Sequence, residues 1–226
     1  MKKGLLIVAA AAMLLAPSCA TLKGLFAGAV GGAAVGAGIG YLITGDAEGA
    51  LKGAAIGGAA GAATGTTIGA VMDKKAKELE KIEAAKIETI TDANGFEAIK
   101  VTFSSGILFD FNSTALSEES KESLKQFATV LEDLGANADI TILGHTDNVG
   151  TAEANEKVSQ KRADAVKKEL KKNGMDPNHL YAQGLSFNKP VADNETEEGR
   201  AKNRRVEIYI TANEDMVKAV EAGTLK

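Results

Sequence analysis

The chain has 226 residues and a formal net charge of −4, which is enough for one or two domains with attachments. This mild acidity argues against nucleic-acid binding, because no basic face outweighs the carboxylates. Most of the 25 glycines lie before Val71, so the first third is nearly uncharged Gly/Ala sequence. The remainder has the composition of an ordinary charged globular domain.

The N-terminal segment has the order of a secretion signal. Two lysines follow Met1, and residues 5–16 form an apolar stretch that is too short to span a bilayer. A proline and a serine then precede Cys19, the only cysteine in the chain. This order resembles a bacterial lipoprotein signal, in which the cysteine is diacylated on sulfur and becomes the new N-terminus. We therefore expect a signal peptide at 1–18 and a lipid on Cys19; the alternative is an ordinary secretion signal with an incidental cysteine.

Residues 19–72 carry glycine at every fourth position in two stretches. Such a step places the glycines along one stripe of a helix. In water this much glycine disfavours a helix by roughly 1 kcal/mol per residue relative to Ala. In a membrane, however, the stripe lets two backbones approach closely. Residues 26–43 and 53–72 are uncharged and about long enough to cross a hydrocarbon core, so we expect a helical hairpin. The glycines concerned are Gly24, Gly28, Gly32, Gly36, Gly40, Gly49, Gly53, Gly57, Gly61, Gly65 and Gly69.

Three interpretations of this glycine-zipper hairpin stay open. It inserts in the membrane, it assembles with copies of itself through the glycine faces, or it is a flexible tether. The regular period counts against a tether, because a flexible linker needs glycine but no register. A channel is not favoured, since no polar residue recurs where a pore lining would need one.

Residues 73–93 are charged and favour a helix, with a thin apolar stripe that includes Leu79 and Ile82. We expect a solvated helical linker; a short coiled-coil seam is the alternative.

The sequence from residue 94 to 213 predicts alternating strands and helices. Asn94-Gly95 is a hairpin-type signal, Ser117 is expected to cap a helix, and Gly135 is expected to end it. This order predicts an α+β fold, a mixed sheet with two helices on one face, followed by a tail at 214–226. The expected strands are 96–103, 107–112, 140–143, 180–184 and 205–210, and the expected helices are 117–135 and 155–173.

No catalytic or metal-binding set stands out in the sequence. His145 and His179 lack a second metal-type ligand at a diagnostic spacing, and there is no Ser/His/Asp or Cys/His arrangement. The loop from Gly144 to Gly150 lacks both the phosphate-loop pattern and the dinucleotide fingerprint. We therefore expect no enzyme activity, no metal and no cofactor.

A binding site is better supported. Asp147 lies in a turn directly after the 140–143 strand, and Arg162 lies one to two turns into the next predicted helix. A zwitterion could offer an ammonium group to the carboxylate and a carboxylate to the guanidinium, whose planar fork suits it. Backbone N–H groups at the helix start could bind a second carboxylate. The alternative is a surface salt bridge worth at most about 1 kcal/mol.

These residues belong to a longer set of motifs. The chain has Gly-His-Thr-Asp-Asn-Val-Gly at 144–150, Val-Ser at 158–159, Arg-Ala at 162–163 and Asn-Arg-Arg-Val-Glu at 203–207. Their order and spacing resemble the OmpA-like C-terminal domain, which anchors bacterial outer membranes to peptidoglycan. The resemblance implies that Asp147 binds the amine of diaminopimelate in the stem peptide and that Arg162 binds a carboxylate. It further implies a pocket lined by Asn112, Asn155, Val158, Thr146 and Ser159 and supported by Asn203 and Arg205.

The resemblance has two departures: Val158 stands where the family usually has Leu, and Glu153-Ala154 where many members have a basic or aromatic residue. The whole layout predicts an outer-membrane lipoprotein with its C-terminal domain in the periplasm, a glycine zipper that could form homo-oligomers, and peptidoglycan as partner. The alternative is a zipper-driven oligomeric or pore-forming membrane protein with an accessory wall-binding domain. The predicted parts are 1–18, 19–72, 73–93, 94–213 and 214–226.

Overall fold

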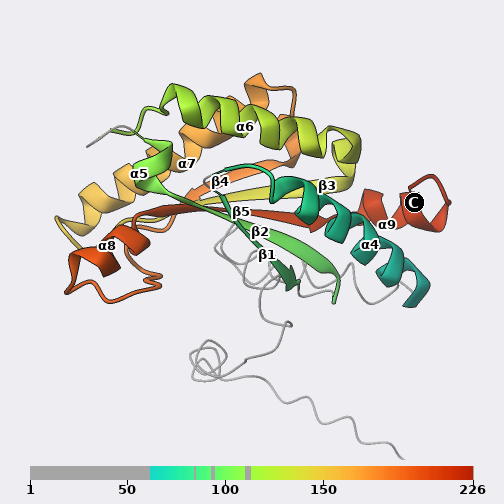
Figure 1. Cartoon of the computed structure of the whole chain (residues 1–226), viewed down its shortest axis with the longest axis horizontal. Helices are drawn as coiled ribbons and strands as arrows, with labels where there is room; N and C mark the ends of the chain where they lie inside the picture. The colour runs from blue at the N-terminus through green and yellow to red at the C-terminus, as the bar shows by residue number, and fades with distance from the viewer. Residues whose placement is uncertain (1–61, 84, 93–94, 110–112, 226) are drawn as a thin grey trace, which may run out of the picture. The chain divides into compact units, whose positions relative to one another are not determined.

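The computed structural model describes residues 62–83, 85–92, 95–109 and 113–225 (Figure 1). Cys19, Asn112 and the predicted hairpin up to residue 61 lie outside these residues. Within the described part, no helix is both long and apolar enough to cross a membrane. The elements are α4 (Ala62–Leu79), β1 (Ala85–Thr91), β2 (Glu97–Ser104), α5 (Ser105–Leu108), α6 (Glu118–Leu131), η2 (Glu132–Asn137), β3 (Ala138–Gly144), α7 (Ala152–Lys172), η3 (Pro177–His179), β4 (Leu180–Gly184), α8 (Glu197–Asn203), β5 (Arg205–Ala212) and α9 (Glu214–Glu221).

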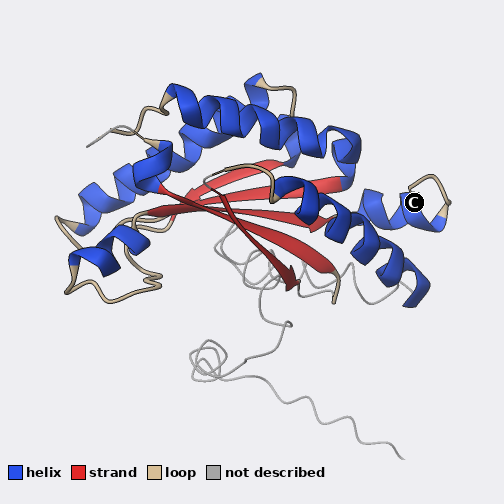
Figure 2. Ribbon diagram, viewed as in Figure 1, coloured by secondary structure: helices blue, strands red, loops and turns tan. Residues whose placement is uncertain are grey.

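The five strands form one mixed sheet in the order β1-β2-β5-β3-β4. β3 and β4 are parallel, and the other neighbours are antiparallel. α6 and α7 lie on one face of this sheet (Figure 2), where α7 contacts β3 and β4. The α+β fold with a mixed sheet and two helices on one face is therefore confirmed.

Alternating strand residues separate an apolar face from a polar one. On β2, Ile99, Val101 and Phe103 are fully buried in the core. Lys100, which points to the opposite face, forms an ion pair with Glu207 of β5 at 2.9 Å. The helices cover the apolar face, while the opposite face carries charged side chains.

Helix α4 is part of this core. Its Ile68 and Met72 are fully buried, and α4 contacts β1, β2 and α6. Lys75 Nζ donates to the Val130 carbonyl of α6 at 2.7 Å and pairs with Asp133 at 2.6 Å. The boundary expected between residues 72 and 73 thus falls inside one continuous helix. Residues 62–72, expected in the zipper hairpin, pack against the sheet.

The prediction of a helical linker at 73–93 is wrong for the described residues beyond Leu79, where α4 ends. Ala85–Thr91 form strand β1, which pairs antiparallel with β2. Four of its seven residues are Ile or Thr, whose branched side chains suit a pleated surface. The turn after it agrees with the hairpin signal: Gly95 has a φ of +81°, and Asp92 Oδ1 accepts the Phe96 N–H at 2.9 Å.

Two other expectations need correction. Where the strand expected at 107–112 should begin, the structure has the short helix α5 up to Leu108 and a single bridge between Phe109 and Leu116, while residues 110–112 lie outside the described residues. Helix α7 begins at Ala152 instead of residue 155, because the Thr151 side chain caps it by accepting the Ala154 N–H at 3.2 Å. By contrast, the cap at Ser117 is confirmed, since its hydroxyl accepts the Ser120 N–H.

Candidate functional site

The site begins where the parallel strands β3 and β4 end. Both strands finish in glycine, Gly144 and Gly184, and both glycines lie against the backbone of α7 at Ser159 and Gln160. A side chain at either glycine would overlap that backbone, so the glycines set how closely α7 approaches the sheet. This close packing of α7 against β3 and β4 fixes the position of the helix relative to the loop that follows β3.

The loop at 145–151 is held by its own side chains. Asp147 Oδ1 accepts the Val149 N–H at 3.1 Å, and Asn155 of α7 donates to the Val149 carbonyl at 3.0 Å. Asp147 is 7% exposed, so its carboxylate is largely withdrawn from water. The Val149 side chain, 63% exposed, projects from the same loop.

The second oxygen of Asp147 is bound by Arg204. Arg204 Nη1 donates to Asp147 Oδ2 at 2.7 Å, and its Nη2 donates to Glu197 at 2.8 Å. These hydrogen bonds, that to Asp147 first, raise the pKa of the Arg204 guanidinium. Sequence reasoning singled out the two neighbours of Arg204 and missed Arg204 itself. The Arg-Arg pair at 204–205 was the available signal, but it does not say which arginine faces the loop.

Arg162 supplies a second cation, ten residues after the start of α7 and thus nearly three turns into it, not one to two. Its guanidinium lies over the Phe109 ring, 5.1 Å from the centroid, and its Nη2 donates to the Ser113 carbonyl at 3.3 Å. Burial lowers the pKa of Arg162, the charge of Arg204 lowers it further, and Asp147 opposes both. The two arginines and the carboxylate therefore act on one another electrostatically.

The Nε of Arg162 is buried and has no hydrogen-bond partner in the described part of the protein. Buried polar groups nearly always have a partner, and a guanidinium is a strong donor. An unsatisfied N–H on a half-buried cation is a position where a carboxylate or other acceptor would bind favourably.

The other expected lining residues are placed differently. Val158 is half-buried one turn before Arg162, on the same helix. Ser159 is fully buried, with its hydroxyl donating to the Glu156 carbonyl and accepting the Ser186 N–H, so it faces the protein interior. Thr146 is 5% exposed, and its buried hydroxyl has no partner among the described residues.

Asn203 and Arg205 both hold the structure around the site. The fully buried Asn203 side chain bonds the backbone of Val191 and Ala192 and so fixes the loop before α8. Arg205 donates to Glu207 at 2.8 Å and to the Lys189 carbonyl at 3.1 Å. Both side chains are thus bonded within the protein, and the supporting role that the family resemblance implies stays a prediction.

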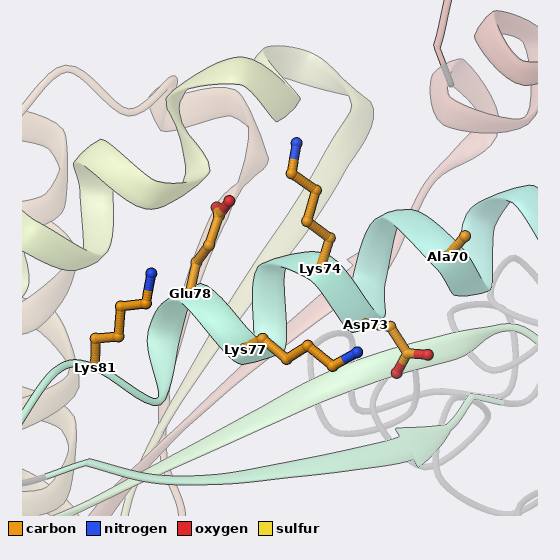
Figure 3. Close-up of a pocket in the computed structure, with 6 residues that line it drawn as sticks. All are labelled: Ala70, Asp73, Lys74, Lys77, Glu78 and Lys81. Carbon is orange, nitrogen blue, oxygen red and sulfur yellow. The ribbon is translucent and has the colours of Figure 1, made fainter.

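A separate hollow of about 430 Å³ lies along α4 (Figure 3). Its lining comes from α4 and the turn that follows it, and none of the expected site residues contributes to it. Long charged side chains such as Lys74 and Glu78 of the helix and Lys81 of the turn project beside it (Figure 3), as on an ordinary solvated surface. Among the described residues, no group of His, Cys, Asp and Glu is arranged to hold a metal ion.

Two stretches of the chain are similar to known protein families. Residues 108–204 match the model of the OmpA family, and residues 1–73 match that of the YMGG-like Gly-zipper. The probable lipoprotein YiaD of Escherichia coli is 34% identical over 145 residues, which are 64% of this chain and 64% of YiaD. Outer membrane protein A of Bordetella avium is 40% identical over 116 residues, 51% of this chain and 59% of that protein. Each match thus spans less than two thirds of the relative.

Solved structures show the same fold. The cell wall anchor of the T6SS from Pseudomonas aeruginosa superposes with a TM-score of 0.52 at 29% identity, over 63% of this chain and 97% of that one. A MotB-like protein from Desulfovibrio vulgaris gives a TM-score of 0.55 at 25% identity, over 66% and 96%. Residues 108–204, which contain Asp147 and Arg162, are therefore similar to the OmpA family, and residues 1–73 are similar to the YMGG-like Gly-zipper.

Proposed function

We propose that this protein binds peptidoglycan through the Asp147–Arg162 site and so holds a membrane to the cell wall without covalent chemistry. The ligand would be the diaminopimelate of the stem peptide, which carries an ammonium and a carboxylate on one centre. The unsatisfied Nε of the half-buried Arg162, which feels the charge of the largely buried Asp147 carboxylate, is the observation that carries the proposal.

The chemistry of the two groups matches such a ligand. Each oxygen of Asp147 accepts one hydrogen bond in the structure, from Val149 and Arg204, and a carboxylate oxygen can accept more than one. An ammonium can therefore join Asp147 without displacing Arg204. A ligand carboxylate can take the free Nε of Arg162 and lie between the two arginines, where it would offset their mutual repulsion.

The other residues are assigned by their placement. We assign Thr146, Asn155 and Val158 to the lining, since they lie on the loop and the adjoining turns of α7. Asn112 is assigned there by family resemblance alone. Ser159, Asn203 and Arg205 position the lining, because their polar atoms are bonded within the protein.

The attachment to the membrane is proposed on the sequence. Diacylated Cys19 would anchor the chain to the outer membrane, with the OmpA-family domain in the periplasm. Lipoproteins named among the relatives support this, including YfiB, an outer-membrane lipoprotein of Pseudomonas aeruginosa that is 39% identical over 110 residues. We propose a binding role and no catalysis.

Sedimentation with purified, insoluble peptidoglycan tests the site. The full chain should sediment with the wall in detergent, and Asp147→Ala or Arg162→Ala should leave it in the supernatant. Lys161→Ala is the matched control, because it removes an exposed cation from the position next to Arg162. Free diaminopimelate should compete with the wall for the wild type. If both site variants sediment like the control while remaining folded, the proposal fails.

A further inference from the structure

Strand β1 forms one edge of the sheet and lies outside the 108–204 range of the family match. Its inner side pairs with β2, and no described strand pairs with its outer side. An edge strand presents unpaired N–H and C=O groups, which offer a ready partner to another strand. β1 has seven residues and contains neither Pro nor Gly, which would interrupt such pairing.

The charges on β1 are arranged in a self-complementary way. Lys86 and Glu88 point to the same face of the sheet, because they are two residues apart. Their side chains are 71% and 39% exposed, and within one chain they form an ion pair at 2.9 Å. A basic and an acidic residue flanking Ile87 can each meet its opposite on a second, antiparallel copy.

Symmetry limits the registers that such a pairing can take. In a twofold antiparallel pair that keeps both helix layers on the same side of the joined sheet, one residue of the strand lies opposite its own copy. If that residue is Glu88, two glutamates face each other, and if it is Lys86, two lysines do; each arrangement is unfavourable. If it is Ile87, Lys86 of each copy lies opposite Glu88 of the other. The charges therefore select a single register among these three.

We propose that two copies of this chain pair through their β1 strands, antiparallel and centred on Ile87, and join their sheets into one. The partner is a second copy because the strand's own charge order complements itself. β1 contains no residue of the peptidoglycan site and none of the glycines of the predicted zipper, so its pairing can be tested whether or not either of those proposals holds.

A disulfide between two different cysteine variants of the chain tests the register directly. Directly opposite residues in antiparallel strands have Cα atoms about 4.5–5.5 Å apart, within the range of a disulfide, whereas residues offset along the strand are too far. In the full chain carrying Cys19→Ser, Lys86→Cys and Glu88→Cys would be made separately, with tags of different mass. Oxidising the mixture should give far more disulfide between the two different variants than disulfide between two copies of the same variant.

The controls make this result decisive. Copies brought together only by the glycine zipper would cross-link as readily within each variant as between the two. Equal cross-linking, or none, overturns the proposal. Each variant would be checked by circular dichroism, so that loss of the strand is not mistaken for loss of pairing.

Charge reversal gives a second, equilibrium test by sedimentation of the full chain. Lys86→Glu converts two opposite-charge contacts into two like-charge contacts, which should weaken the dimer about tenfold. Adding Glu88→Lys to the same chain reverses both charges and should restore it. Lys125→Glu, an exposed change on α6, is the control and should have no effect. Failure of the double variant to recover dimerisation overturns the proposed register.

Discussion

Substituting Gly144 by alanine tests how α7 is seated on the sheet and hence how the site is held. The added methyl group would overlap the Ser159 carbonyl, which is backbone and cannot rotate away. Ordinary contact distances would require α7 to move by about 1 Å. Overpacking of this kind costs about 1–3 kcal/mol, and we expect the upper end because no flexible side chain can yield.

The magnitude can be measured by thermal unfolding of the full chain. A loss near 3 kcal/mol corresponds to a fall in Tm of about 6–12 °C for a protein of this size. Gly106→Ala is the control, since its methyl group would come no closer than 3.9 Å to Ser104 and Gly106 lacks a left-handed φ. That variant should change stability by less than about 1 kcal/mol.

The same substitution should also affect binding. A shift of about 1 Å in α7 would move Arg162 relative to Asp147, and such misplacement weakens recognition of a bound group strongly. Gly144→Ala should therefore bind peptidoglycan more weakly than wild type at a temperature where both are folded. A variant with wild-type Tm and wild-type binding would show that α7 does not lie against Gly144 as described.

Three further outcomes follow from the structure. Glu207→Gln should destabilise the fold by about 3–5 kcal/mol, because it leaves two buried or half-buried cations without their carboxylate, as urea unfolding would show. Burial works to raise the pKa of Glu207, but His145, Arg205 and Lys100 lower it more. The stability that the Glu207 carboxylate contributes is therefore present above the unfolded pKa of about 4.3 and is lost as pH falls below it. Glu207→Gln should make the unfolding free energy less dependent on pH in this acidic range. Arg162→Lys should keep the Tm but lose most peptidoglycan binding, since an ammonium cannot reproduce the planar fork; unchanged sedimentation would contradict this.

Much of the fold could be predicted because its helices and strands have clear periodicity. The apolar spacing of α6 and α7 and the cap at Ser117 determined those elements within a few residues. Strand β1 was missed because its Lys and Glu continue the charge pattern of the preceding helix. Its strand character depends on pairing with β2, which lies beyond the turn at Gly95. Context of that kind is not encoded in a local window.

For the candidate site, too, local motifs could be predicted from the sequence and contacts between distant residues could not. Asp147 and Arg162 lie in motifs that a sequence shows directly, and the structure brings them into electrostatic contact. Arg204 pairs with Asp147 across 57 residues, a contact that only the adjacency of β3 and β5 creates. Sequence spacing alone gives no reason to prefer Arg204 over Arg205.

The packing of α4 against the sheet affects the proposed membrane attachment. Since α4 and β1 belong to the domain, residues 73–93 would add no spacer between the domain and the proposed lipid on Cys19. Only residues 20–61, forty-two in number, remain for that role. They reach at most about 150 Å if fully extended, and about 60 Å if helical throughout. If Cys19 carries the proposed lipid, the glycine-rich segment would set the anchoring distance. Its insertion in a membrane would then bring the domain that we propose to bind the wall close to the bilayer.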